Sequence, residues 1–189
     1  REPDGANAYM LDTDKVAAFL WEYEKFIEKR GKKDAVSDLP GVYKDTLKRF
    51  VNGFFLNDGK KIMSSFQKLA GAGKGLTPSC DDAMVGAMSL LYPLYLLGRI
   101  SGHAKQYFQN AGLIKKALLE EEITTDISCK YLKCACEGYF SEPLQRISDW
   151  IFTGVNGELE DLFKPMATIG HSSGLDMLVG MEAVAEALI

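Results

Sequence analysis

The longest stretch of this chain without a charged residue runs from Ala83 to Gly98 and is sixteen residues long. A helix that crosses a membrane needs about twenty predominantly apolar residues, so this stretch is too short to span a bilayer. A helix that is apolar on every side must instead be surrounded by other elements of the protein. The sequence therefore predicts a buried central helix that ends near Leu97 and is kinked or shortened by Pro93.

Apolar residues recur at helical spacing along the rest of the chain, and we find no convincing strand-like alternation. Glycine, proline and Asn-Asp-Gly segments separate the periodic stretches. Besides the central helix, the predicted helices are 16–27, 47–55, 62–69, 103–110, 113–121, 125–138, 142–152, 157–163 and 174–189. The predicted fold class is all-α, a multi-helix single domain over 1–189.

Charge and length exclude several classes of protein. The 189 residues fit one domain, and a net charge of −4 disfavours a surface that binds nucleic acid or anionic membranes. The chain begins at Arg1 with no apolar signal segment, so we expect a cytoplasmic protein. Any anion site must then be local, built from dipoles and a few side chains.

The cysteines do not have metal-binding spacing. They are Cys80, Cys129, Cys134 and Cys136, with no Cys-x2-Cys pair and no histidine nearby in sequence. Zinc sites require such pairs, so we predict reduced, structural thiols.

Two segments about ninety residues apart have nearly the same sequence. Residues 75–86 read GLTPSCDDAMVG, and residues 170–180 read GHSSGLDMLVG. Aligned on the aspartates, Asp82 matches Asp176 and Gly86 matches Gly180. Each segment is a hydroxyl-rich turn, then Ser-x-x-Asp, then an apolar helix. We therefore expect two central helices that start at paired loop–helix motifs, although the similarity does not extend into a repeat of the chain.

The motifs have two interpretations from the sequence. In the first, each is only a capping box, in which the oxygen of Ser79 or Ser173 accepts from the backbone near the aspartate. In the second, the free N–H groups of two facing helix starts bind an anion. Hydroxyl groups and a lysine would donate to the anion as well, and glycines would let the backbone approach it closely. The candidate ligand-binding residues are Lys74, Gly75, Thr77, Ser79, Asp81, Gly170, Ser172, Ser173 and Gly174.

Acidic residues complicate an anion site. Asp81, Asp82 and Asp176 would repel a bare anion, so they must cap their helices, bind a divalent cation or hold an amide or ammonium group. Carboxylates with hydroxyls suit Mg²⁺ better than zinc. Magnesium is therefore a possible cofactor, but the sequence assigns no residue as a metal ligand. His171 lies just ahead of a helix start, where it would stay neutral as a hydrogen-bond donor or general base, or simply pair with the cap. The candidate catalytic residues are His171, Asp82 and Asp176.

Two further interpretations, a phosphate-binding loop and a cysteine nucleophile, have little support in the sequence. The glycines of residues 71–75 do not form a phosphate-binding P-loop, because Lys68 stands where that motif needs its first glycine. Cys80 is a weak candidate nucleophile, since the second motif has Gly174 at the matching place.

At these residues the chain resembles a bacterial family typified by the AllH subunit of oxamate carbamoyltransferase. The family pattern is Gly-Leu-Thr-Pro-Ser-Gly-Asp-Asp and, later, Gly-His-Ser-Ser-Gly-x-Asp. Residues 75–82 match the first part with Cys80 in place of a glycine, and residues 170–176 match the second without a break. Thr124, Thr125 and Ser128 resemble the middle part of the pattern.

The resemblance, which spans roughly residues 69–180, implies a carbamoyltransferase-like subunit that acts with other protein subunits in ureide and purine nitrogen catabolism. It also implies that the chain is the C-terminal part of a longer family protein. The expected ligand is a small carboxylate or carbamoyl compound such as carbamoyl phosphate, held between two helix N-termini. A non-catalytic ligand-binding or scaffold subunit and a Mg²⁺-dependent hydrolase are the alternatives, so whether the chain is catalytic stays open.

Overall fold

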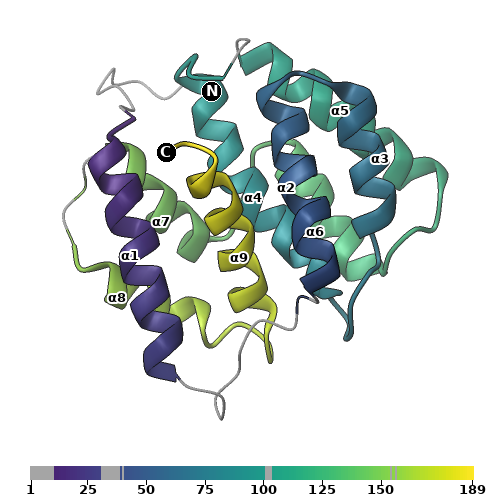
Figure 1. The fold of residues 1–189 in the computed structure, drawn as a ribbon. Coiled ribbons are helices and arrows are strands. Elements are labelled where there is room, and N and C mark those ends of the chain that lie inside the picture. Colours follow the sequence, from purple (N-terminus) through teal and green to yellow (C-terminus); the bar gives the residue numbers. More distant parts are fainter. Residues whose placement is uncertain (1–10, 31–38, 40, 101–103, 154, 156) are drawn as a thin grey trace.

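The computed structural model describes residues 11–30, 39, 41–100, 104–153, 155 and 157–189, and this part of the chain forms nine α-helices and no strand (Figure 1). The helices are α1 (Thr13–Arg30), α2 (Gly41–Phe55), α3 (Gly59–Leu69), α4 (Ser79–Leu96), α5 (Ala104–Glu120), α6 (Asp126–Cys136), α7 (Glu142–Thr153), α8 (Leu159–Met166) and α9 (Ser173–Glu186). The all-α prediction is therefore confirmed. None of the described helices is both long and apolar enough to cross a membrane.

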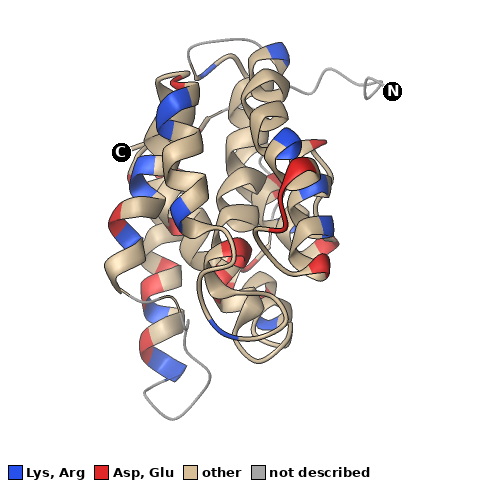
Figure 2. Cartoon of the chain, turned by 90° about the vertical axis from the view of Figure 1, so that its right-hand side faces the viewer, with Lys and Arg blue, Asp and Glu red and all other residues tan. Residues whose placement is uncertain are grey.

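Helices α4 and α9, which follow the two motifs, lie at the centre. Figure 1 shows them between α1, α7 and α8 on one side and α2, α3, α5 and α6 on the other. Every residue of α4 from Ser79 to Leu91 is buried. Most charged residues lie on the outer helices, and α4 carries none after Asp82 (Figure 2). The charge-free stretch forms the buried helix that its sequence predicts, and this helix continues past Pro93 for one turn.

Two glycines let the central helices touch backbone to backbone. A Cβ atom on Gly86 would lie 1.9 Å from the carbonyl oxygen of Met177, and one on Gly180 would lie 1.8 Å from that of Ala83. Ala83 and Met177 are themselves matched positions of the two motifs, so each helix presents the same pair of positions to the other. Such a reciprocal contact is typical of approximate two-fold symmetry, and it explains why both motifs end in glycine.

One predicted helix boundary is wrong. Residues 103–110 and 113–121 were expected as separate helices, but α5 runs without a break from Ala104 to Glu120, and His103 lies outside the described residues. Glycine at position 112 is less favourable inside a helix than alanine by only about 1 kcal/mol. Tyr107, Ile114 and Leu118 continue one buried face across it, and burial of that face outweighs the local cost.

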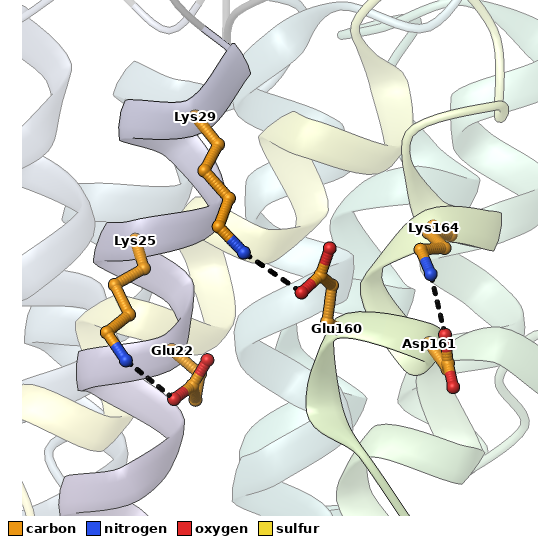
Figure 3. A network of polar contacts seen from close by, with 6 residues as sticks. All are labelled: Glu22, Lys25, Lys29, Glu160, Asp161 and Lys164. Atoms are coloured by element: carbon orange, nitrogen blue, oxygen red, sulfur yellow. Dashed lines mark hydrogen bonds and ion pairs between the residues drawn. The ribbon is translucent and has the colours of Figure 1, made fainter.

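Exposed ion pairs and a buried aromatic cluster join α1 to α8. Lys29 Nζ lies 3.0 Å from a carboxylate oxygen of Glu160, with further pairs within each helix (Figure 3). Exposed pairs of this kind contribute at most about 1 kcal/mol. The ring of Phe163, fully buried, packs against Phe19, Tyr23 and Phe26. This cluster therefore holds α8 in place and, with it, the chain that leads into the second motif.

Candidate functional site

The two motifs meet at the wall of a cavity. The hydroxyl oxygens of Thr77 and Ser173 are 2.8 Å apart, which joins the loop before α4 to the start of α9. Beside this contact is a cavity of about 460 Å³. Its lining residues are Leu76, Thr77, Asp82, Val85, Ile127, Tyr131, Cys134, Tyr139, Phe140, Ser141, Leu144, Ile169, Gly170, Ser173 and Met177. Apolar walls with a few polar groups at one end are typical of small-molecule sites.

Glycines shape the chain around this cavity. Gly75 and Gly170 have φ values of +94° and +59°, in the left-handed region that favours glycine, so each makes the turn before its helix. Gly174 serves packing instead, because a Cβ atom there would lie 1.8 Å from the carbonyl oxygen of Met166. Of these three predicted ligand-binding glycines, only Gly170 lines the cavity.

The capping-box interpretation is wrong. The residues that precede α4 and α9 are Pro78 and Ser172, and neither side chain caps its helix. Ser79 and Ser173 are the first residues inside the helices, one position too late to cap them. The hydroxyl of Ser173 pairs with Thr77 across the motifs. The matched serines thus do not act as the local caps that their spacing suggested.

Asp82 is the polar group that sets the chemistry of the cavity. Its side chain is 1% exposed, and within the described part of the chain its Oδ2 has no hydrogen-bond partner. Burial raises the pKa of Asp82 to about 7, and hydrogen bonding by the hydroxyls of Ser173 and Thr77 partly opposes that rise. The charges of Asp176 and Asp81 raise it further. At neutral pH this carboxyl therefore exchanges a proton readily and can either accept or donate a hydrogen bond.

Asp176, its match on α9, is fully buried and close enough to influence Asp82 electrostatically. It is not among the residues that line the cavity. Burial raises the pKa of the Cys80 thiol, and the negative charges of Asp81 and then Asp176 raise it further. Cys80 is thus an inert core residue, and Asp176 acts on the cavity through Asp82.

Asp81 is turned toward α6. One of its carboxylate oxygens accepts from the backbone N–H of Gly71 at 2.9 Å, and the other accepts from the hydroxyl of Thr124. Burial raises the pKa of Asp81, while the bonds from Thr124 and Gly71 lower it. The neighbouring Thr125 caps α6 and donates to the carbonyl of Leu76 at 2.6 Å. The middle segment of the family pattern therefore anchors the first motif.

The remaining predicted residues lie away from the cavity. Lys74 and His171 are exposed and do not line it, Ser172 is half-buried, and Ser79 is buried in the helix start. The predicted site residues that line the cavity are Thr77, Asp82, Gly170 and Ser173. Among the described residues, no three His, Cys, Asp or Glu side chains are grouped to hold a metal ion. Because Asp81 bonds to Thr124 and Gly71, the three aspartates do not form the magnesium site considered above.

The apolar half of the cavity was not predicted from the two motifs. It comes from α6, the loop after it and α7, and includes Ile127, Tyr131, Cys134 and Phe140. The first three recur at helical spacing on a face of α6 separate from its buried residues Ser128, Leu132, Ala135 and Cys136. A second apolar stripe on one short helix was the signal available in the sequence.

The elements that build this cavity coincide with a family match. The family described as oxamate carbamoyltransferase subunit AllH matches residues 69–185, more than half of the chain. The chain belongs to the AllH family. Both motifs, α6, α7 and the two central helices lie inside the matched residues, whereas α1 and α2 lie outside them. Membership makes the chain a subunit associated with oxamate carbamoyltransferase, which implies protein partners. No solved structure matches the chain.

Proposed function

We propose that this AllH-family chain contributes the cavity at the starts of α4 and α9 to a carbamoyltransferase, and that the cavity holds the carbamoyl group of its ligand. The observation that carries the proposal is the buried Asp82, whose Oδ2 lacks a partner in the described part of the chain. A carbamoyl group supplies N–H donors for that oxygen, and its carbonyl oxygen can accept from the one hydroxyl of the Thr77–Ser173 pair that does not donate to the other. Asp82 and that hydroxyl would then bind the two sides of the amide.

Charge favours a carbamoyl group over a phosphate at this end of the cavity. The lining contains no lysine, arginine or histidine. Two helix N-termini attract an anion by about 0.3–1 kcal/mol each at exposed positions, which is small beside the repulsion from buried carboxylates. A phosphate or carboxylate beside Asp82 and Asp176 would be left without a countercharge. The ligand would therefore enter with its uncharged amide toward Asp82.

In this proposal Asp82 also handles the proton. When an amine or alcohol attacks the carbamoyl carbon, it must lose a proton, and the leaving group must gain one. A carboxyl with a pKa of about 7 serves both steps near neutral pH. The hydroxyl of the Thr77–Ser173 pair that does not donate within the pair holds the carbonyl oxygen, and this positioning provides the rest of the rate gain.

A second candidate is a non-catalytic binding or scaffold subunit. It is favoured by the mouth of the cavity, where Leu76 and Tyr139 are 76% and 67% exposed, because exposed apolar patches mark interaction surfaces. In this case a partner subunit would carry the reacting groups. Turnover of the assembled enzyme separates the two candidates: Asp82→Asn should abolish turnover if this chain is catalytic, whereas Leu76→Ser should weaken assembly in either case.

The direct test is a thermal-shift series with oxamate, oxamide and oxalate, which share one skeleton and differ only in amide and carboxylate groups. A ligand at a hundred times its Kd adds about 2.7 kcal/mol, or roughly 5–10 °C for a chain of this size. We expect oxamate and oxamide, but not oxalate, to stabilise the wild type, and Asp82→Asn to lose most of the shift. Asp45→Asn, the same change on the exposed face of α2, is the matched control. Equal shifts with oxalate, or an undiminished shift in Asp82→Asn, would rule out the proposed binding mode.

A further inference from the structure

A second cavity lies between α2 and α3, which do not line the cavity at the two motifs. Figure 1 shows the two helices side by side, joined by the turn at Asn57. The cavity measures about 540 Å³, and its lining includes Arg49 from α2 and Lys60, Lys61 and Lys68 from α3. Thr46 and two serines add hydroxyl groups. We call this cavity the α2–α3 groove.

The positive charge of the groove exceeds its negative charge. Elsewhere in the described residues, six lysines form ion pairs with carboxylates. Arg49 and the three lysines of the groove form none within the same part of the chain. The one carboxylate in the lining, Asp58, is already used as the cap of α3, where it accepts from the backbone N–H of Lys61 at 3.0 Å. A local excess of cations in a chain of net charge −4 indicates a site for an anion.

The arrangement of the cations suits a phosphate. Lys61 and Lys68 lie seven residues apart, on the same face of α3, and Arg49 reaches the groove from the other helix. The planar guanidinium of arginine binds phosphate oxygens in pairs, and lysine adds point charges. Thr46 adds a hydroxyl group to the same lining. Cations on two packed helices can thus clamp one ligand from both sides.

We propose that the α2–α3 groove binds a small ligand that carries a di- or triphosphate group. The small size of the groove favours a small molecule over a polymer, and the overall negative charge of the chain disfavours nucleic acid. Four cations against the one carboxylate of Asp58 leave an excess of positive charge that matches a di- or triphosphate better than a single phosphate. Helix α2 and nearly all of α3 precede the residues matched by the AllH family.

Titration calorimetry with pyrophosphate and with ADP, in metal-free buffer at about 150 mM salt, tests this site. We expect saturable binding to the wild type and a roughly tenfold or greater weakening in the double variant Arg49→Gln, Lys68→Gln, since each lost charge-assisted bond contributes a factor of this order. Both side chains are exposed, so the variant should keep the fold. The matched control is Lys116→Gln, Lys164→Gln, which removes the same charge elsewhere and should bind within about twofold of the wild type.

Three outcomes would overturn the proposal. They are no saturable binding to the wild type, equal weakening in the groove variant and its control, or tighter binding of an oligonucleotide or an acidic peptide than of pyrophosphate. Asp82→Asn should leave pyrophosphate binding unchanged, because Asp82 is not part of the groove lining. The groove and the carbamoyl site are therefore tested independently.

Discussion

The contact between α4 and α9 makes a strong prediction for Gly86→Ala. The new methyl carbon would sit 1.9 Å from the backbone oxygen of Met177, about 1.5 Å short of an ordinary contact. The obstacle is backbone on a fully packed helix, so no side chain can rotate away. Overpacking typically costs 1–3 kcal/mol, and a rigid backbone obstacle places this substitution at or above about 3 kcal/mol.

Urea unfolding followed by circular dichroism measures that cost. A loss of about 3 kcal/mol corresponds to a Tm lower by roughly 6–12 °C for a protein of this size. Because the two helices must move apart, the pairing of Thr77 with Ser173 should weaken and oxamate binding should fall as well. The reciprocal variant Gly180→Ala should give the same result, since its methyl carbon would meet Ala83 in the same way.

Gly112→Ala is the matched control. Gly112 also lies inside a helix, but no atom lies within 4 Å of the position its Cβ would take. Alanine there gains helix propensity and should stabilise the protein by up to about 1 kcal/mol. If Gly86→Ala changed the free energy of unfolding by less than about 0.5 kcal/mol while the control behaved as expected, the close helix contact would be refuted.

Two further predictions concern pH and the α1–α8 contact. The pKa of Asp82 is about 7 in the folded chain and near 3.8 when unfolded, so the folded state binds this proton more tightly and the side chain destabilises the protein increasingly as pH rises from about 4 to about 7. Urea titrations should therefore find that Asp82→Asn becomes more stable than the wild type by up to about 4 kcal/mol between about pH 4 and pH 7, with no further gain above about pH 8. A difference in the free energy of unfolding that does not vary with pH would contradict the raised pKa. Phe163→Ala should cost about 3–5 kcal/mol by removing the ring that joins α8 to α1, and Lys29→Ala no more than about 1 kcal/mol by removing one exposed ion pair. Comparable losses in the last two variants would show that the Lys29–Glu160 ion pair stabilises the contact as much as the aromatic cluster does, contrary to this prediction.

Much of the fold follows from local pattern. The charge-free stretch after Asp82 predicted a buried helix, because a segment without charged residues has no side that favours water. The repeat of one motif predicted that two such helices belong together. The boundary within α5 was missed because tertiary burial of one continuous face outweighs the small local penalty of Gly112.

The candidate site could be predicted only in part. Thr77, Asp82, Gly170 and Ser173 were named from the motifs and line the cavity. Asp81 was named beside them, but successive residues on a helix point about 100° apart, so Asp81 faces Thr124 while Asp82 faces the cavity. The sequence shows that both carboxylates lie in the first turn of one helix, but it does not show which residues each of them contacts.

The helical class, the central position of two helices and the family can all be read from the order of the residues. Which side chains form the cavity depends on packing, because half of its wall comes from α6 and the residues after it, far from either motif in sequence. Packing also gives the reason for the matched glycines: Gly86 and Gly180 are required by a contact between two backbones. The periodicity of apolar residues predicts which residues are buried. A site depends in addition on which faces of different helices are brought together by packing.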